Sequence, residues 1–305
     1  MTTRTAGTGS AHAPTGPTAP TAPTALIIRA PGTNCDVELA RAFTLAGAHT
    51  NLVHIDALIA EPGLIDRANL IGIPGGFSYG DDIASGRIVA SRLRQHLYSK
   101  LRQAVGRGCP VFAVCNGFQI AVQAGLLPGP AVGQPWPTTP GEQQLSLSHN
   151  AGGRFVDRWV PVRAEGASVC VWTKGLAEAF ADRPEAMMLP IAHGEGRVVA
   201  RSTGVLQRLS ASGQVALRYG RTPVPSVPGQ LGALHPDNPN GSSDDIVGVC
   251  DASGRVFGLM PHPERYLDWN RHPFWTRLPE GTRRGDTPGM VMFNNAVRAA
   301  REVMV

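Results

Sequence analysis

The sequence lacks a long hydrophobic run. No stretch of its 305 residues approaches the roughly 20 consecutive apolar residues that a membrane-spanning helix needs. The first residues also lack the apolar core of a secretory signal peptide. We therefore expect no membrane association and a cytoplasmic location.

Paired cysteines are absent as well. The five cysteines form no CxxC pair and show no Cys/His spacing typical of a zinc site. Their odd number in a chain of this length argues against a disulfide framework. We expect reduced thiols, no metal and no cofactor on this chain. Structural roles are expected for Cys35, Cys109, Cys170 and Cys250.

The sequence has little charge of either sign. Charged residues make up 17% of it, aromatic residues 6%, and the formal net charge is +5. No basic block is interleaved with aromatic residues, as nucleic-acid binding would favour. Neither a GxGxxG nor a Walker phosphate loop occurs. The composition therefore favours neither nucleic-acid binding nor a nucleotide site on this chain.

The first 24 residues differ in composition from the rest. They are rich in Thr, Ala, Pro and Gly and contain no Val, Ile or Leu. Such a segment cannot bury enough apolar surface to offset the entropy of ordering it. We predict a disordered tail at 1–24 and a single domain at 25–305.

Short apolar runs alternate with helical patterns in the first half of this domain. Such alternation predicts parallel βαβ units, and thus an α/β fold with a doubly wound, mostly parallel sheet and helices on both faces. The second half is richer in strands, and 129–145 has the Pro, Gly and Gln content of a surface insertion. Expected strands are 26–28, 51–55, 70–73, 111–114, 154–162, 168–172, 196–201, 214–219, 246–250 and 257–260; expected helices are 38–46, 87–105, 118–124 and 292–303.

Cys115 directly follows an apolar strand and precedes a helix. Ala113 and Gly117 flank it at positions −2 and +2, where a tight strand–nucleophile–helix turn requires small residues. The N-terminus of the helix favours the thiolate form. Cysteine is also a common core residue, so this context alone leaves a nucleophile and a buried structural thiol about equally well supported.

Two further segments supply groups that a thiol nucleophile needs. In an extended segment His262 and Glu264 project to the same side, so the imidazole accepts the thiol proton and the carboxylate orients the ring. The turn of Gly75, Gly76 and Phe77 presents backbone N–H groups that, with the N–H of Asn116, form an oxyanion hole. Taken singly, each segment is equally consistent with an ordinary turn.

A second His/Glu pair occurs at His193 and Glu195, between glycines. It is consistent with a substrate-binding loop or with a rival catalytic pair.

Several of these segments together resemble the triad-type (class I) glutamine amidotransferases. Within that family the chain is similar to the glutaminase subunits of phosphoribosylformylglycinamidine synthase, an enzyme of de novo purine biosynthesis. The resemblance covers about residues 25 to 303. It depends on the motifs PGTNCD at 31–36, PGGFSYGD at 74–81, CNGFQ at 115–119, AHGEG at 192–196, NPNGS at 238–242 and MPHPER at 260–265.

The resemblance implies a flavodoxin-like domain that hydrolyses glutamine through a thioester on Cys115, with His262 as base and then acid and Glu264 orienting it. It implies that ammonia passes to a synthetase partner, which uses ATP and magnesium to convert formylglycinamide ribonucleotide to the amidine. Whether a small third subunit is also needed is left open. Gln119, one helical turn past the nucleophile, is implied to contact bound glutamine.

The sequence departs from the family pattern at two positions of these motifs. Ala113 stands where the elbow usually begins with Gly, and a methyl group is tolerable there if φ is not positive. Val198 stands where an aromatic residue is usual. Two alternatives remain: another triad amidotransferase or stand-alone Cys hydrolase of this fold, and a non-catalytic partner-binding subunit.

Overall fold

The computed structural model describes residues 22–220 and 238–304. Residues 1–21 of the predicted tail lie outside the described residues, so the tail stays a prediction there. The first strand begins at Thr24, one residue before the predicted start of the domain.

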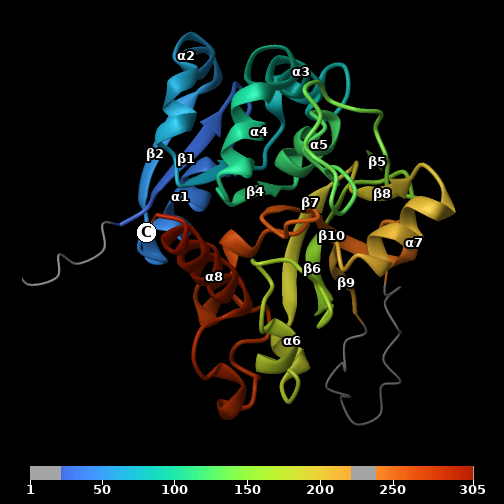
Figure 1. Ribbon diagram of the computed structural model, residues 1–305. Helices are drawn as coiled ribbons and strands as arrows, with labels where there is room; N and C mark the ends of the chain where they lie inside the picture. The colour runs from blue at the N-terminus through green and yellow to red at the C-terminus, as the bar shows by residue number, and fades with distance from the viewer. Residues whose placement is uncertain (1–21, 221–237, 305) are drawn as a thin grey trace, which may run out of the picture.

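A nine-stranded sheet forms the centre of the described structure, in the order β2-β1-β3-β4-β11-β10-β9-β6-β7, and β5 and β8 form a separate pair (Figure 1). The strands are β1 (Thr24–Arg29), β2 (His49–His54), β3 (Leu70–Ile73), β4 (Val111–Val114), β5 (Leu145–Ser148), β6 (Val156–Ala164), β7 (Met188–His193), β8 (Arg197–Ala200), β9 (Val215–Tyr219), β10 (Ile246–Cys250) and β11 (Val256–Leu259).

The first five strands in this order run parallel to one another. Their order, 2-1-3-4 followed by the last strand, is that of a flavodoxin-like doubly wound sheet. From β10 onward, each strand pairs antiparallel with its neighbour. The predicted fold class is therefore confirmed, and the strand-rich second half of the chain extends the same sheet.

Helices cover both faces of the parallel strands: α3, α4 and α5 lie on one side, and α1 and α8 on the other (Figure 1). The predicted helix at 87–105 is interrupted by a π-helical turn at Leu93–Leu97. None of the described helices is both long and apolar enough to cross a membrane. The α-helices are α1 (Asp36–Leu45), α2 (Ile55–Ala60), α3 (Arg87–Arg92), α4 (Tyr98–Gly106), α5 (Asn116–Gln123), α6 (Leu176–Ala179), α7 (Thr203–Ala211) and α8 (Pro288–Glu302).

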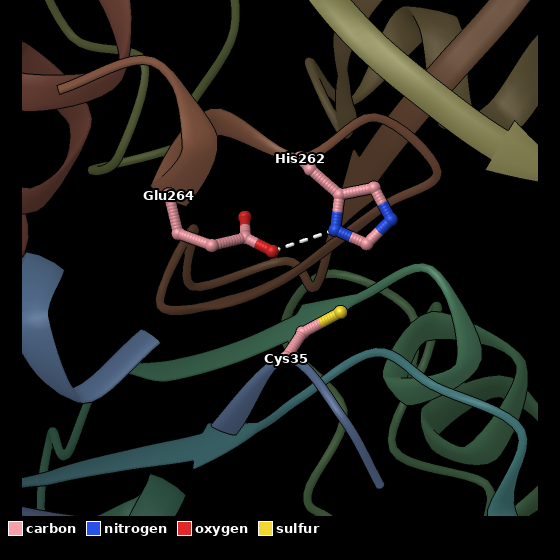
Figure 2. Close-up of side chains that lie close together, drawn as sticks. All are labelled: Cys35, His262 and Glu264. Atoms are coloured by element: carbon pink, nitrogen blue, oxygen red, sulfur yellow. Dashed lines mark hydrogen bonds and ion pairs between the residues drawn. The ribbon is translucent and has the colours of Figure 1, made fainter. Parts of the chain in front are cut away.

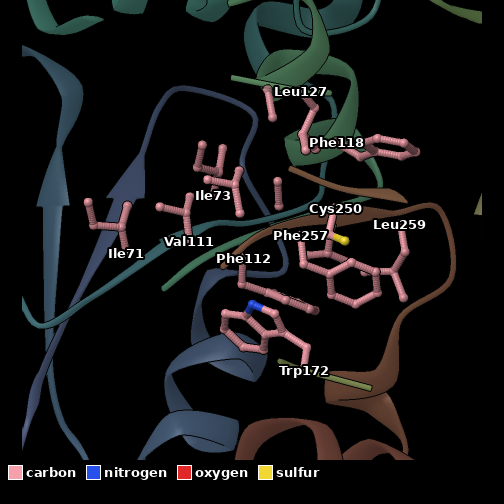
Figure 3. Close-up of a cluster of buried hydrophobic side chains, with 14 of the residues drawn as sticks. Ile71, Ile73, Val111, Phe112, Phe118, Leu127, Trp172, Cys250, Phe257 and Leu259 are labelled. Atoms are coloured by element: carbon pink, nitrogen blue, oxygen red, sulfur yellow. The ribbon is translucent and has the colours of Figure 1, made fainter. Parts of the chain in front are cut away.

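Aromatic packing fixes the strands that carry the candidate residues (Figure 3). Phe112 of β4 contacts Trp172 and Phe293, with ring centroids 4.8 and 5.2 Å apart. On the other face, a Cβ atom at Gly258 of β11 would lie 2.2 Å from the Phe118 ring of α5. Because that position has no side chain, α5 packs directly against β11. The helix after Cys115 and the strand before His262 are thereby held side by side.

One strand prediction is wrong, and one strand of the central sheet was missed. The segment 168–172 is not a strand, because the N–H groups of Val169 and Val171 donate to Gly213 and Gly254 in neighbouring loops. Strand β7 was not predicted, since Pro190 interrupts its apolar pattern. It lies at the end of the sheet order, where a proline is tolerated.

The predicted insertion at 129–145 contains no helix, and β5 begins at its last residue. Trp136 anchors it: this ring packs against the core, and Arg102 donates to the Trp136 carbonyl at 3.3 Å. Residues 129–144 are exposed or half-buried, as expected of a surface insertion.

Candidate active site

Cys115 lies at the turn between β4 and α5 with φ 53° and ψ −110°. A positive φ in a residue with a side chain costs on the order of 1–3 kcal/mol and requires support from its surroundings. Part of that support is a hydrogen bond of 2.8 Å from the Cys115 N–H to the Leu259 carbonyl at the end of β11. The strained elbow predicted for the nucleophile is therefore present, and β11 holds it.

The two small residues that flank Cys115 are needed for different reasons. A Cβ atom at Gly117 would lie 1.9 Å from the Ile73 carbonyl oxygen, so no other residue fits. Ala113 lies inside β4, is fully buried and is not among the residues with positive φ. Its methyl group is therefore accommodated, as the sequence predicts.

His262 and Glu264 meet directly after β11. Nδ1 of His262 lies 2.6 Å from Oε1 of Glu264, and both side chains are at most 2% exposed (Figure 2). The His262 N–H donates to the Pro190 carbonyl at 2.8 Å, which fixes the backbone of the pair. The predicted contact is confirmed, but its geometry differs: a 3₁₀ turn at Pro263–Arg265 brings the carboxylate back toward the ring, where an extended segment was expected.

The environment of His262 favours its charged form. Burial by itself lowers the pKa of the imidazole, but the Glu264 carboxylate, the Cys115 sulfur and a hydrogen bond with Cys35 raise it. The pKa of His262 is raised well above its ordinary value. A protonated His262 beside Cys115 stabilises a thiolate, which is the reactive form of a cysteine nucleophile.

Gly75 is the point where these side chains converge. A Cβ atom there would lie 2.8 Å from His262 Cε1, 3.2 Å from Cys35 Sγ and 3.3 Å from Cys115 Cβ. Gly76 has φ 141° and approaches the backbone of 32–34 closely, so it too must be glycine.

The Phe77 N–H is not free to be an oxyanion donor, because it donates to the Gly32 carbonyl at 2.9 Å. A substrate-binding role for Phe77 stays a prediction. Its ring is 46% exposed and stacks on Phe155, with centroids 6.3 Å apart. The N–H groups of Gly75, Gly76 and Asn116 remain the candidate donors.

Gly75→Ala is expected to lower glutaminase kcat/KM by about 10- to 100-fold, because a displacement near 1 Å at a catalytic group has effects of that size. Gly63→Ala is the matched control, since a Cβ atom there meets nothing within 4 Å. Steady-state kinetics of both variants would check this. Equal activities would contradict the convergence at Gly75.

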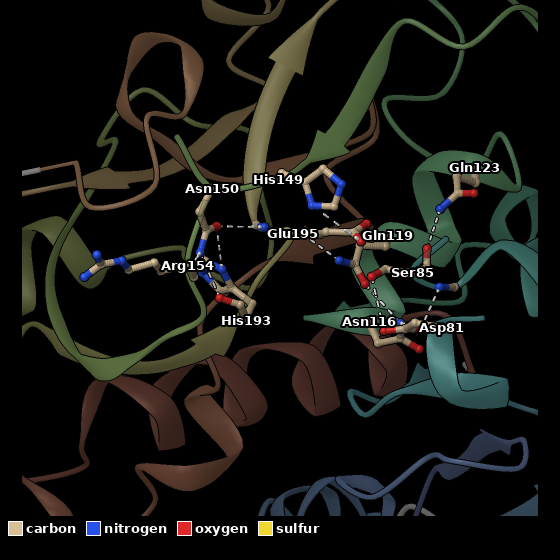
Figure 4. A network of polar contacts seen from close by, with 12 residues as sticks. Asp81, Ser85, Asn116, Gln119, Gln123, His149, Asn150, Arg154, His193 and Glu195 are labelled. Atoms are coloured by element: carbon tan, nitrogen blue, oxygen red, sulfur yellow. Dashed lines mark hydrogen bonds and ion pairs between the residues drawn. The ribbon is translucent and has the colours of Figure 1, made fainter. Parts of the chain in front are cut away.

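Asn116 and Gln119 tie two loops to the elbow (Figure 4). The Asn116 amide donates to Asp81 Oδ1 at 3.2 Å and to Gln119 Oε1 at 3.0 Å. Gln119 in turn donates to the Glu195 carbonyl at 2.6 Å. In this structure Gln119 therefore positions the loop at 192–196, and its predicted contact with glutamine stays a prediction.

His193 and Glu195 do not form a pair, so the rival catalytic pair is excluded. His193 Nδ1 lies 3.1 Å from Asn150 Oδ1, whereas Glu195 lies 3.8 Å from His149 (Figure 4). Asn150 also donates to the His193 carbonyl at 2.9 Å. The sequence offered no signal for Asn150, because its partners in the AHGEG loop lie 43 or more residues away. Its amide also donates to the nearby Arg154 carbonyl at 2.8 Å.

Burial lowers the pKa of His193 to about 4. A folded pKa below the unfolded value means that the unfolded chain binds the proton first. Stability is therefore expected to fall as the pH decreases from about 6.5 to 4, by about 3 kcal/mol from this residue. Urea unfolding between pH 7 and 4 would measure it. His193→Gln should reduce this pH dependence, while the same change at the exposed His96 should not.

Cys35, predicted to be structural, lies beside the candidate catalytic residues. It precedes α1, and Arg265 Nη2 donates to its sulfur at 3.2 Å. Burial raises the pKa of the Cys35 thiol, and interaction with His262 partly opposes that.

A buried thiol on a strained elbow, a His/Glu pair and glycine N–H donors form an arrangement suited to acyl transfer. The family model of the CobB/CobQ-like glutamine amidotransferase domain matches residues 22–298.

Two curated relatives are described as phosphoribosylformylglycinamidine synthase subunit PurQ. The protein of Dehalococcoides mccartyi is 37% identical over 278 residues, which cover 91% of this chain and 98% of the relative. That of Treponema denticola is 39% identical over 244 residues, covering 79% and 87%. A chain in the structure of PurLQS from Thermotoga maritima has a TM-score of 0.60 at 28% identity, covering 91% of this chain and 99% of that chain. The chain therefore belongs to the PurQ family of glutamine amidotransferase subunits of phosphoribosylformylglycinamidine synthase.

Proposed function

We propose that this chain hydrolyses glutamine with Cys115 as nucleophile, His262 as general base and acid, and Glu264 as the group that orients His262. The buried 2.6 Å contact between His262 and Glu264, at the glycine that also adjoins Cys115, carries the proposal. The strained Cys115 backbone supports it, since such strain is typical of nucleophile elbows.

The reaction begins with attack of the Cys115 thiolate on the side-chain amide carbon of glutamine. The carbonyl oxygen becomes an oxyanion, stabilised by the N–H groups of Gly75, Gly76 and Asn116. His262 then gives its proton to the amide nitrogen, and ammonia leaves as the C–N bond breaks. A γ-glutamyl thioester remains on Cys115.

Water completes the cycle. Neutral His262 takes a proton from water as the water oxygen attacks the thioester carbon. Collapse of the second tetrahedral intermediate breaks the C–S bond, releases glutamate and restores the thiolate beside the imidazolium. The Glu264 carboxylate stabilises that imidazolium, consistent with the raised pKa of His262.

The ammonia passes to a synthetase subunit that holds ATP and magnesium and converts formylglycinamide ribonucleotide to formylglycinamidine ribonucleotide. The stacked and exposed rings of Phe77 and Phe155, beside the Gly76 turn, provide apolar surface for this contact. A cytoplasmic location remains our expectation, supported by five free cysteines.

Reconstitution with the synthetase tests the proposal. Adding the synthetase is expected to raise the glutaminase rate and to yield glutamine-dependent synthesis of the amidine. A peptidase or γ-glutamyl hydrolase activity independent of the synthetase would contradict it.

A further inference from the structure

Three possible metal ligands come together at the candidate active site: Cys35, His262 and Glu264. One ligand atom from each lies within 4.8 Å of those of the other two, and all three side chains are buried. Figure 2 shows the Cys35 sulfur pointing toward the imidazole ring that contacts Glu264. Because Cys35 precedes α1 and the other two follow β11, no local spacing in the sequence marks this cluster.

The Glu264 carboxylate has an unsatisfied oxygen. Its Oε1 contacts His262, but Oε2 is buried and has no hydrogen-bond partner among the described residues. The side chain is 0% exposed, so this oxygen does not reach the protein surface. A buried carboxylate oxygen without a partner is costly, and a bound cation would remove the cost.

The geometry points to a binding site for a zinc-like divalent cation, with Cys35 Sγ, His262 Nδ1 and the Glu264 carboxylate as ligands. Thiolate, imidazole and carboxylate are ligands that Zn²⁺ prefers, at about 2.3, 2.0 and 2.1 Å. Ligand atoms around tetrahedral zinc are therefore about 3.6 Å apart. The Cys35 sulfur, within 4.8 Å of the other two ligand atoms, must approach by about 1 Å at most, and His262 Nδ1 and Glu264 Oε1, now 2.6 Å apart, must separate by roughly 1 Å. A water molecule supplies the fourth ligand.

Charge favours this assignment. A thiolate and a carboxylate balance the two positive charges of the cation, so the buried cluster becomes neutral. The Arg265 guanidinium, 3.2 Å from Cys35 Sγ, supports the thiolate and at the same time repels a cation. Glu38 offsets that repulsion, because its carboxylate accepts from Arg265 Nε at 3.0 Å.

Metal binding would stop catalysis, a consequence that depends on the proposed function. The cation displaces two protons, one from the Cys35 thiol and one from Nδ1 of the His262 imidazolium, and both go to solvent. It then occupies the Nδ1 position that His262 shares with Glu264. His262 can then no longer exchange protons with Cys115 and substrate. The site would make the glutaminase reversibly sensitive to zinc.

Binding is tested on Cys115→Ala protein, which removes the proposed nucleophile but none of the three ligands. Calorimetry with Zn²⁺ is expected to show one ion per chain. Co²⁺ should give the absorption band of thiolate coordination. Adding Cys35→Ser should abolish that band and weaken Zn²⁺ binding by at least about 100-fold. Adding Glu264→Gln should also weaken binding, whereas Cys109→Ser, at a buried thiol beside Pro110, should not.

The outcomes separate this inference from the proposed function. Zinc binding that disappears with Cys115→Ala, or persists undiminished in folded Cys35→Ser and Glu264→Gln proteins, would overturn the metal site and leave the triad intact. Inactivity of the unmodified chain toward glutamine in the reconstituted complex would overturn the proposed function and leave the binding result unaffected. Thermal melting of each variant shows that it is folded.

Discussion

Cys115→Ala is expected to abolish glutamine-dependent synthesis by the reconstituted complex, by at least about 10⁴-fold, because no other group can form the thioester. Ammonia-dependent synthesis should persist near the unmodified rate, since that reaction belongs to the synthetase. Measuring product formation with glutamine and with ammonium salts, on one preparation, gives both results.

Cys109→Ala is the matched control for this experiment. Cys109 is also buried and precedes the same strand, β4, at its opposite end. Burial raises the pKa of its thiol to about 12, so it is protonated at neutral pH. The control should retain glutamine-dependent synthesis. If Cys115→Ala also retained it, the thioester mechanism would be wrong.

The elbow could be predicted from sequence because its determinants are local. Strand β4, the small residues around Cys115 and the start of α5 lie within a dozen positions of one another. The His262–Glu264 contact was predictable for the same reason, although the 3₁₀ turn that makes it was not. Prolines on both sides of His262 suggested a stiff segment, but not its direction.

Contacts between distant segments could not be predicted in this way. Arg265 contacts Cys35 across 230 residues, and no spacing rule connects them. Asn150 has no distinctive neighbours in the sequence, yet it holds both His193 and the Gly196 N–H. The failed prediction for Phe77 as an oxyanion donor has a similar cause, because the turn at residues 32–34 takes up its N–H from a different strand end. Tertiary packing assigned these partners, and a single sequence does not record it.

Glu264→Gln is expected to lower glutaminase kcat/KM on the order of 10³-fold, because the amide keeps the shape of the carboxylate but loses its charge. That charge is a principal reason why the pKa of His262 is raised despite burial. Its removal lowers the pKa, so the imidazolium loses its proton at lower pH. The alkaline limb of the pH profile of kcat/KM should shift to lower pH.

The control for Glu264→Gln is Glu38→Gln, which removes a half-exposed carboxylate that pairs with Arg265 rather than with His262. The alkaline limb of the kcat/KM pH profile of Glu38→Gln should stay where it is in the unmodified protein. A purely structural role for Glu264 predicts the opposite pattern, namely lost stability with an unchanged pH profile of the remaining activity.

The pH dependence of unfolding stability provides an independent check of the effect of the Glu264 charge on His262. A raised folded pKa means that His262 contributes stability below its unfolded pKa, and that this contribution is lost as the pH rises through the folded value. Glu264→Gln should reduce this alkaline loss, because the raised pKa depends on the carboxylate charge. The substitution also removes the negative charge from the position of Oε2, which is buried and has no hydrogen-bond partner among the described residues. Urea unfolding from pH 6 to 9 should therefore show a flatter dependence in the variant, even though its activity falls steeply.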